Sequence, residues 1–390
     1  MRITRIVETA VPLRSNLRNA VFDFSEMTTS VVAVVTDVMR EGRPVAGFAF
    51  NSTGRYACGA QMRARFIPRL LQAAPESLFD ASGENLSPER ALACMLQREK
   101  PGGHTERSIA IGTIEVALWD AVAKIAGKPL HRVLAERYNG GKVRDKVFCY
   151  VGGGWYLPGK GIAGLQDEIR ARLDEGYTLM KIKVGGATVA EDVARVEAAL
   201  EIVGSGANLA VDANAAFDRE RALAYAQALA PLRLRWFEEP TDPLDYGLLA
   251  EFVARYEPPV ATGENLFSTQ DVRNLARFGG LRAGRDIIQT DVPQSYGIVQ
   301  FARTLDMLAG LGWQRASMFP HGGNQMTLHI VGGFGLGGCE SYPDVFGAFA
   351  GFADDAKVDH GSLALPQRPG IGFEAQNALY GIMREMVESN

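Results

Sequence analysis

The sequence has 390 residues, of which 47% are hydrophobic and 22% are charged, and its formal net charge is −4. This composition is that of a globular protein with a large core and excludes an intrinsically disordered chain. A chain of this length is longer than most domains with a single hydrophobic core, which indicates two domains or one barrel with a smaller attached domain. The negative charge and the lack of a basic run argue against a nucleic-acid partner.

Cysteine spacing and the N-terminal residues predict a cytoplasmic protein. The cysteines form no CxxC or Cys/His pattern, so neither a zinc site nor a disulfide framework is expected. Residues 1–15 place charges among the apolar residues, unlike a signal peptide, and no later stretch is apolar for the roughly 18 residues that span a membrane. We therefore expect neither export nor a membrane partner.

Residues 1–135 are expected to form an α+β domain. Apolar runs at residues 30–38 and 45–50 predict strands. The longest predicted helix covers residues 106–127, where apolar residues recur every three or four positions and Gly127 precedes Lys-Pro.

Residues 136–350 are expected to form a closed barrel. Short apolar runs alternate there with amphipathic helices, which is typical of parallel β/α units, and eight such runs favour a barrel over an open sheet. Residues 351–390 include a predicted helix at 375–388, and we expect them to pack on the N-terminal domain and complete it as a cap. The predicted barrel strands are residues 147–151, 179–184, 208–214, 234–240, 260–266, 286–292, 315–321 and 338–343.

Polar residues lie at the ends of seven predicted barrel strands, each about one β/α unit from the next. A single carboxylate at a strand end often only caps the following helix. Seven polar residues in phase instead indicate a shared site at the C-terminal mouth of the barrel, where barrel enzymes place their chemistry. These residues are Lys183, Asp212, Glu238, Glu264, Asp291, His321 and Glu340.

Three of these carboxylates, Asp212, Glu238 and Glu264, lie on consecutive strands and predict a metal site. With no Cys or His among them they form a hard oxygen site, which suits one Mg²⁺ better than Zn²⁺. Because Mg²⁺ prefers six ligands, three carboxylates leave room for water and a chelating substrate. The alternative is an acidic rim neutralised by solvent ions.

Lys183 is the predicted general base. Lys181 and Lys183 project to the same side of one strand, and their repulsion makes it easier to deprotonate one of them. His321 precedes two glycines and is expected to act with Asp291, whose carboxylate would orient the imidazole. The other four histidines are expected to be structural.

One motif is a false match. Residues 333–338 fit GxGxxG in letters, but they follow a predicted helix and lead into a strand, the reverse of a dinucleotide site. No NAD or other organic cofactor is predicted.

The motifs around the seven residues resemble the enolase superfamily, and within it the mandelate racemase subgroup. The likeness covers essentially the whole chain and implies a TIM-like (β/α)₇β barrel with an α+β capping domain. Asp291 argues against the muconate cycloisomerases, where a lysine replaces it. The matching segments are KIK (181–183), VDAN (211–214), FEEP (237–240), GEN (263–265) and PHGG (320–323).

Four further segments, 15–30, 50–56, 99–108 and 321–325 together with 335–344, resemble acid-sugar dehydratases of the D-tartrate dehydratase type. Thr53 stands where an asparagine is usual and Trp155 where a tyrosine is usual. The substrate-binding residues that this resemblance implies are Asn19 and Thr53 on capping loops, Lys100 and Trp155 nearby, Lys181 on the substrate carboxylate and Glu340 at the rim.

The predicted reaction is dehydration of an acid sugar or hydroxy-diacid, with D-tartrate to oxaloacetate as the case that the resemblance favours. The substrate's carboxylate and 2-hydroxyl would chelate Mg²⁺, Lys183 would remove the adjacent proton, and His321 would protonate the departing 3-hydroxyl. A racemase or epimerase would use the same residues, and a noncatalytic metal-stabilised binding protein is a third alternative. The expected partners are a small carboxylate substrate and further copies of this chain.

Overall fold

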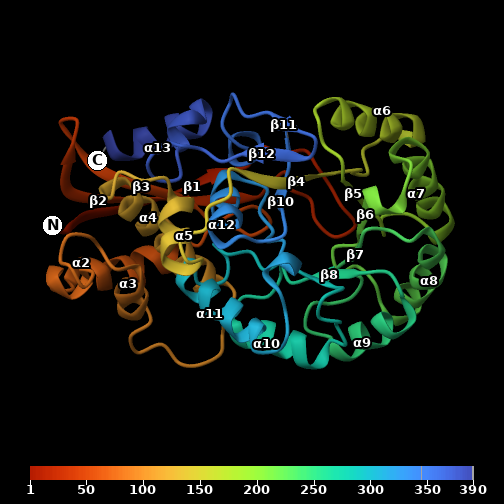
Figure 1. Ribbon diagram of the computed structural model, residues 1–390, viewed down its shortest axis with the longest axis horizontal. Coiled ribbons are helices and arrows are strands. Elements are labelled where there is room, and N and C mark those ends of the chain that lie inside the picture. Colours follow the sequence, from red (N-terminus) through yellow and green to blue (C-terminus); the bar gives the residue numbers. More distant parts are fainter. Residues whose placement is uncertain (344, 389–390) are drawn as a thin grey trace.

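The computed structural model describes residues 1–343 and 345–388 (Figure 1). Its N-terminal part contains an antiparallel sheet in the order β1–β2–β3, so both strands predicted in this region are present. The first strand has no counterpart among the predicted ones. The three strands are β1 (Ile3–Pro12), β2 (Thr28–Arg40) and β3 (Arg43–Phe50).

The long helix α4 (Glu106–Ile125) lies against this sheet and is almost wholly buried from Ser108 onward. Gly47 of β3 explains how the helix comes so close. A Cβ atom at this position would lie 2.1 Å from the carbonyl oxygen of Ala117, so only glycine permits the approach. The other helices of this part are α1 (Gly59–Gln61), α2 (Ile67–Gln72), α3 (Pro88–Met95) and α5 (Leu130–Tyr138).

The middle of the chain is a parallel barrel. Each strand from β4 to β8 pairs with the next, up to β9, and the last strand, β10, pairs with β4, which confirms the predicted fold class. The strands are β4 (Lys146–Gly153), β5 (Met180–Lys183), β6 (Leu209–Asp212), β7 (Phe237–Glu238), β8 (Val260–Thr262), β9 (Ile287–Ile288) and β10 (Cys339–Ser341).

Helices surround the barrel strands, as the right-hand part of Figure 1 shows. Local signals set their ends: α7 begins at a capping box formed by Thr188 and Glu191 and ends at Gly204, whose φ of 76° is left-handed. The barrel helices are α6 (Gly161–Asp174), α7 (Val189–Val203), α8 (Arg219–Leu229), α9 (Tyr246–Arg255), α10 (Thr269–Phe278), α11 (Ile298–Ala309) and α12 (Gln325–Phe334).

The seventh predicted barrel strand, residues 315–321, is wrong in its first half. Arg315–Ser317 form a 3₁₀ turn, and only Met318 makes an isolated bridge, to Ile288. The chain still completes the ring, because the backbone N–H groups of Phe319 and His321 donate to Ile288 and Gln289 at 3.0 and 3.2 Å. Pro320 lies between them and has no N–H to donate, which limits regular pairing.

Inside the barrel, apolar side chains form a layer directly beneath the charged ones. Successive residues of a strand face opposite sides, so Trp236 shares its side with Glu238, and Leu179 with Lys181. The apolar layer closes the bottom of the barrel and leaves the polar groups at the C-terminal ends of the strands. It consists of Tyr150, Leu179, Ala210, Trp236, Ala261, Ile287 and Phe319.

The C-terminal segment divides between the two parts of the fold. Helix α13 (Asn377–Glu388) packs on β1 and β2, but the hairpin of β11 (Val358–Asp359) and β12 (Ser362–Ala364) pairs with β4. Helix α13 thus lies on the sheet of the capping part, whereas β12 pairs antiparallel with residues 146–148 at the start of β4, and the assignment of residues 351–390 to the cap stays a prediction. The predicted boundary at residues 135/136 falls inside α5 and stays a prediction.

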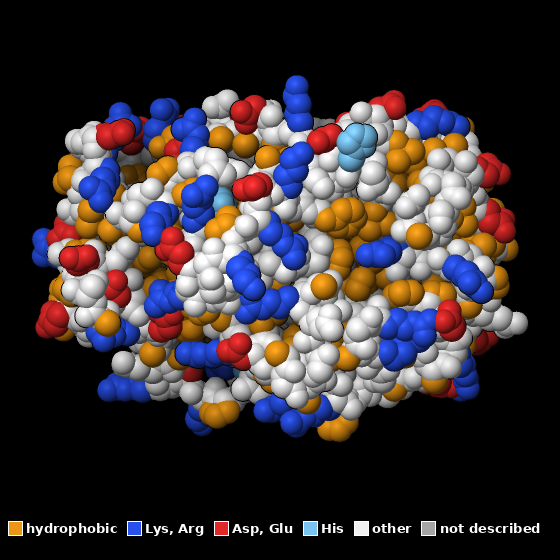
Figure 2. All heavy atoms as spheres, viewed as in Figure 1, with side chains coloured by type: hydrophobic (Ala, Val, Ile, Leu, Met, Phe, Trp, Pro, Cys, Tyr) orange, Lys and Arg blue, Asp and Glu red, His pale blue; other side chains and the backbone are white. Residues whose placement is uncertain are grey.

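Within the described ranges, no helix is long and apolar enough to cross a membrane. Basic, acidic and apolar side chains are mixed over the face shown in Figure 2.

Candidate functional site

The strand register brings the predicted residues together at one end of the barrel. Lys183, Asp212 and Glu238 are the last residues of β5, β6 and β7, and they pair across the sheet as neighbours. Glu264 and Asp291 follow β8 and β9 by a few residues. The charges therefore stand where the parallel strands stop and the barrel opens.

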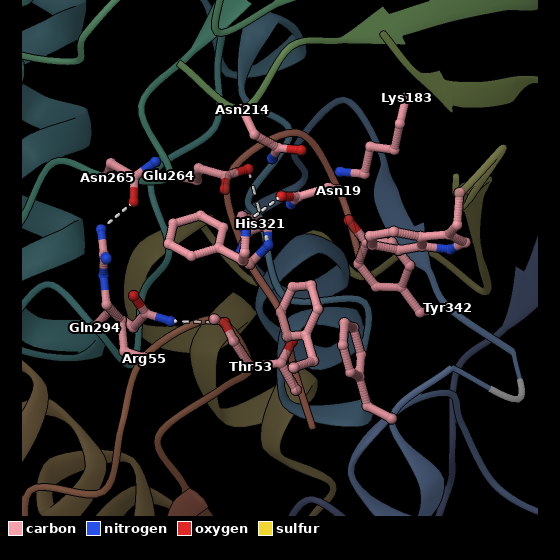
Figure 3. A pocket seen from close by; sticks show the side chains of 15 residues that line it. Asn19, Thr53, Arg55, Lys183, Asn214, Glu264, Asn265, Gln294, His321 and Tyr342 are labelled. Carbon is pink, nitrogen blue, oxygen red and sulfur yellow. Dashed lines mark hydrogen bonds and ion pairs between the residues drawn. The ribbon is translucent and has the colours of Figure 1, made fainter. Parts of the chain in front are cut away.

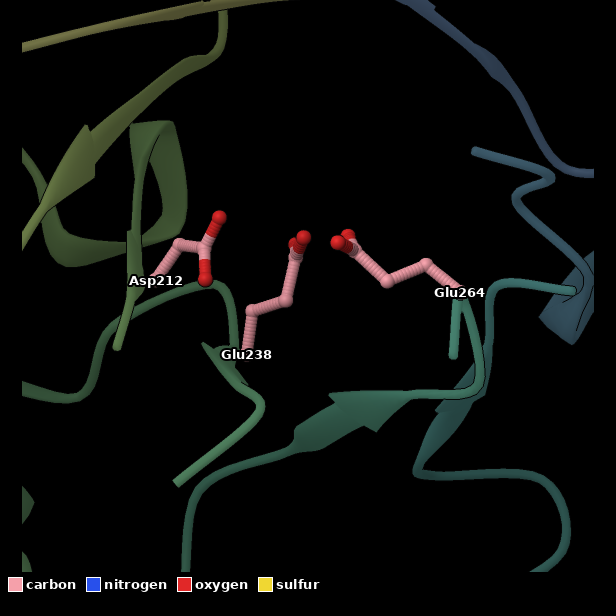
Figure 4. Close-up of side chains that lie close together, drawn as sticks. All are labelled: Asp212, Glu238 and Glu264. Atoms are coloured by element: carbon pink, nitrogen blue, oxygen red, sulfur yellow. The ribbon is translucent and has the colours of Figure 1, made fainter. Parts of the chain in front are cut away.

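Three carboxylates form the centre of this end. Asp212, Glu238 and Glu264 each place one oxygen within 4.8 Å of the others, and they converge as Figure 4 shows. Asp212 and Glu238 are fully buried, whereas the Glu264 side chain is 14% exposed. Glu264 has no closer charged partner among the described residues than His321 Nε2 at 3.9 Å. An oxygen of Glu264 is thus free to bind a cation.

The charges of the site also fit a divalent cation. Around the triad, five carboxylates are in contact with three cationic side chains, so negative groups are in excess there, which favours a bound cation. The carboxylates are Asp212, Glu238, Glu264, Asp291 and Glu340, and the cationic groups are Lys181, Lys183 and His321.

The two inner carboxylates differ in their pKa values. Burial raises the pKa of Glu238 to about 8, despite the opposing effect of Lys181. Burial would also raise the pKa of Asp212, but Lys183 and Lys181 lower it to about 2. Trp236 Nε1 and Gln289 Nε2 both donate to one oxygen of Glu238, at 2.9 and 2.7 Å. The second oxygen of Glu238 faces Lys181.

The two lysines occupy different environments. Lys181 Nζ is fully buried and lies 2.5 Å from both Glu238 and Glu340. Burial would lower the pKa of Lys181, but these two carboxylates raise it well above its usual value. Lys183 lies 2.5 Å from Asp212 and lines the cavity, with its ammonium 4.8 Å from the centre of the Trp155 ring. Only Lys183 is therefore placed to reach a bound molecule.

His321 stands on the other side of the carboxylates. Its Nδ1 lies 2.8 Å from Asp291 Oδ2. Burial would lower the pKa of His321, but Glu264 and Asp291 raise it to about 10, so the imidazolium form prevails at neutral pH. With Nδ1 held by Asp291, Nε2 is the nitrogen that faces Glu264 and the cavity.

These groups open into a small cavity between the capping part and the barrel (Figure 3). Three of the predicted substrate-binding residues, Asn19, Thr53 and Trp155, line it. Lys181 and Glu340 lie beneath the lining, and Glu340 is fully buried rather than at the rim, because it is the middle residue of β10 and pairs with Tyr150 of β4. The lining residues are Asn19, Phe22, Phe24, Thr53, Gly54, Arg55, Trp155, Lys183, Asn214, Glu264, Asn265, Gln294, His321, Tyr342 and Phe346.

Lys100 does not line the cavity. Its side chain is exposed, and its backbone oxygen accepts a hydrogen bond from Arg107 at 2.8 Å. Arg107 also donates to the Tyr296 hydroxyl at 2.9 Å and so holds the loop of Lys100 against the barrel. A role of Lys100 in substrate binding stays a prediction.

The capping loops are held in place by their own polar groups. The side-chain oxygen of Asn19 accepts from the backbone N–H groups of Val21 and Phe22, at 2.8 and 2.6 Å, and so forms a local turn. The backbone oxygen of Thr53 accepts from Gln294 Nε2 at 3.1 Å. Gln294 thus ties a capping loop to the barrel segment that carries Asp291.

Several lining residues were not predicted. Asn214 and Asn265 lie within two positions of Asp212 and Glu264, and Gln294 lies three positions after Asp291, so adjacency to the predicted residues was the available signal. Arg55 follows Thr53 by two positions. Nothing in their spacing alone marks Tyr342, Phe346 or the phenylalanines of residues 22–24, which come from loops.

Glu239, the residue after Glu238, was also not predicted. It is buried with a left-handed φ of 43°, and Asn265 Nδ2 donates to both of its carboxylate oxygens, at 2.7 and 3.0 Å. Burial and the nearby Glu264 raise its pKa well above the usual value, which favours the neutral acid.

Comparison with known proteins agrees with this arrangement. The family model "Enolase C-terminal domain-like" matches residues 164–379. The chain is 31% identical over 284 residues to arabinonate dehydratase of Saccharolobus solfataricus, covering 70% of this chain and 72% of that enzyme. It is 32% identical over 264 residues to L-talarate/galactarate dehydratase of Salmonella typhimurium, covering 68% of this chain and 62% of that enzyme.

Solved structures share the fold over nearly the whole length. A racemase from Streptomyces coelicolor A3(2) with bound magnesium has a TM-score of 0.77 and 26% identity, covering 97% of this chain and 99% of that one. L-talarate dehydratase from Polaromonas sp. JS666, in complex with Mg and L-glucarate, has a TM-score of 0.73 and 26% identity, covering 95% and 94%.

Proposed function

The chain belongs to the enolase superfamily, and from this premise we propose that it is a Mg²⁺-dependent dehydratase of a hydroxy-diacid of the D-tartrate type, which it converts to oxaloacetate. One observation carries the proposal: Lys183 and the Asp291–His321 pair face one cavity from two sides of a carboxylate triad. An elimination needs a base at one carbon and an acid at the leaving group of the next, and this arrangement offers both.

Asp212, Glu238 and Glu264 would hold the metal ion. When bound, Mg²⁺ supplies positive charge that stabilises the negative charge developing on the substrate carboxylate as the α-proton leaves. The free oxygen of Glu264 and the convergence of the three carboxylates support this assignment.

Two side chains carry out the proton transfers. Lys183 takes the proton from the carbon next to the carboxylate, and the electron pair of that C–H bond first delocalises into the carboxylate to give an enolate. In a second step this electron pair forms the new C2–C3 double bond as the C–O bond of the 3-hydroxyl breaks. His321 gives its Nε2 proton to the departing oxygen, so that water leaves. Asp291 holds the imidazole through Nδ1. The enol that results tautomerises to the 2-keto acid.

The remaining predicted residues would bind substrate or shape the site. Lys181 sits between Glu238 and Glu340 and holds positive charge beneath the position of the substrate carboxylate. Asn19 and Thr53 would contact substrate from the cap, and Trp155 from beside Lys183.

A second candidate, a racemase or epimerase, would use Lys183 and His321 as bases on opposite faces of one carbon. The structural likeness to the racemase from Streptomyces coelicolor A3(2) favours it. The two dehydratases of similar sequence favour elimination, and so does the contact of His321 Nδ1 with the Asp291 carboxylate, which stabilises the protonated form of the imidazole.

The test is a panel of hydroxy-diacids and sugar acids incubated with the protein and Mg²⁺. Formation of a 2-keto acid is scored with a ketone-specific reagent, and recovered substrate is analysed for inverted configuration. A keto acid from a tartrate isomer supports the proposal. Inversion of configuration without keto acid would establish the second candidate in its place.

A further inference from the structure

Arg55 crosses from the capping part to the barrel. It lies in the loop after β3, lines the cavity, and donates through Nη2 to the side-chain oxygen of Asn265. Its guanidinium lies 5.1 Å from the centre of the Phe267 ring. Because Asn265 uses its amide nitrogen on Glu239, its oxygen has to face Arg55, which fixes the guanidinium from the barrel side.

The guanidinium is a cation without an anionic partner. Among the described residues it makes no ion pair, and its Nε is buried with no hydrogen-bond partner. A guanidinium has five N–H donors in a planar fork that matches a carboxylate. A buried donor left unpaired costs free energy, so this arrangement is expected where a ligand completes it.

The other cations of the cavity already have carboxylate partners. Lys183 faces Asp212 at 2.5 Å, and His321 is held by Asp291 at 2.8 Å. Figure 3 shows Arg55 next to Asn265, with His321 between this pair and Lys183 in that view. The one positive charge in the lining that is free to meet an anion therefore lies away from Lys183.

We propose that Arg55 binds the distal carboxylate of the substrate and thereby makes the enzyme selective for diacids over monoacids. This inference rests on the proposed function, in which the proximal carboxylate of the substrate lies at the triad. The distal carboxylate then needs its own cation, and Arg55 can supply a bidentate pair from the capping loop.

Two non-reactive ligands isolate the distal carboxylate. Malate and 2-hydroxybutyrate of the same configuration share the 2-hydroxy acid group, and neither has a 3-hydroxyl to lose. Malate carries a second carboxylate where 2-hydroxybutyrate carries a methyl group. Titration calorimetry in the presence of Mg²⁺ gives the dissociation constants of both for the parent protein, Arg55→Met and Arg55→Lys.

The parent is expected to bind malate at least about 10-fold more tightly than 2-hydroxybutyrate, as a charge-assisted hydrogen bond provides. Arg55→Met should abolish this preference by weakening the binding of malate alone, and Arg55→Lys should retain part of the preference. Arg18→Met is the control, since Arg18 is 69% exposed, pairs with Asp23 on a capping loop and does not line the cavity. It should leave the ratio unchanged.

An unchanged ratio in Arg55→Met would overturn the inference. An equal loss of affinity for both ligands would also overturn it, because a residue that only ties the loop to Asn265 affects the binding of both ligands alike. The proposed function is judged separately by the keto-acid panel. A parent that forms no keto acid, yet loses its malate preference on Arg55→Met, would refute the reaction and keep the carboxylate site.

Discussion

The Nδ1 atom of His321 lies 2.8 Å from Oδ2 of Asp291, and this contact decides which ring nitrogen faces the cavity. The other oxygen of Asp291 accepts from the backbone N–H of Gln294 at 3.2 Å, so the carboxylate is fixed from two sides. A carboxylate on one nitrogen of an imidazole orients the ring and favours its protonated form. His321 is therefore held ready to donate through Nε2.

Replacing Asp291 with asparagine should slow the elimination by about 10²- to 10⁴-fold in kcat, the usual contribution of a general acid, with little change in KM. The amide keeps the shape of the carboxylate and loses its charge. Keto-acid formation at saturating substrate measures the effect. Asp286→Asn is the matched control, because Asp286 is also buried beside β9 but pairs with Arg282. A comparable loss of kcat per folded molecule in the control would contradict the role given to Asp291.

Lys181→Met should destabilise the fold by about 3–5 kcal/mol, the typical cost of leaving one partner of a buried ion pair uncompensated. The lysine lies 2.5 Å from both Glu238 and Glu340, and all three side chains are fully buried. Urea unfolding measures the loss. The double variant Lys181→Met/Glu340→Gln should recover part of it, since one stranded carboxylate is then neutral. Strictly additive losses would show that the pair is not coupled.

Mg²⁺ should raise the melting temperature, because a ligand that binds only the folded state stabilises it, by about 2.7 kcal/mol at 100 times its dissociation constant. Glu264→Gln should abolish most of this rise, and EDTA should reverse it in the parent. Glu239→Gln is the matched control, since a glutamine resembles the neutral acid that burial favours at this position. If the Mg²⁺-dependent rise in melting temperature persists in Glu264→Gln and disappears in Glu239→Gln, the metal does not bind at the triad.

The barrel and its charged end could be predicted from the sequence because both follow from regular repeats along the chain. Side chains alternate along a strand and each β/α unit returns the chain to the same end, so Lys183, Asp212 and Glu238 could be aligned without a structure. The comparisons confirm the fold class and the superfamily. The roles of the individual side chains stay predictions until they are tested.

The parts that were not predicted depend on contacts between distant segments. Arg55 meets Asn265 across 210 positions, and Gln294 meets Thr53 across 241, so no local pattern marks either pair. The position of the Lys100 loop depends on Arg107, which donates to the backbone oxygen of Lys100 and, across 189 positions, to the hydroxyl of Tyr296. The seventh strand failed because Pro320 and a 3₁₀ turn interrupt an otherwise apolar run.

Stability should fall as the pH drops from about 6.5 toward 4, in part because of two buried histidines. Burial lowers the pKa of His131 to about 4 and that of His329 to about 3. His329 is held neutral between the backbone oxygen of Ile371 and the backbone N–H of His131, at 2.9 and 3.1 Å. The unfolded chain therefore binds more protons than the folded one in this range, and each group costs up to about 1.4 kcal/mol per pH unit.

The measurement for the histidines is the free energy of unfolding as a function of pH. In His329→Gln, the free energy of unfolding should depend less steeply on pH, because the protonation of His329 no longer contributes. The substitution is also expected to lower stability at neutral pH. His360→Gln should keep the parental slope, because the His360 side chain is 97% exposed. Equal slopes in all three proteins would refute the assignment.

The central claim is that Lys183 removes the α-proton and His321 expels the hydroxyl, and proton NMR in D₂O with Mg²⁺ and a tartrate isomer tests it most directly. The parent should form a keto acid. His321→Asn should exchange the α-proton for deuterium without forming keto acid, so that the substrate keeps its hydroxyl. Lys183→Ala should neither exchange the α-proton nor form keto acid. A Lys183→Ala protein that exchanges the α-proton and forms keto acid at the parental rate would contradict the account.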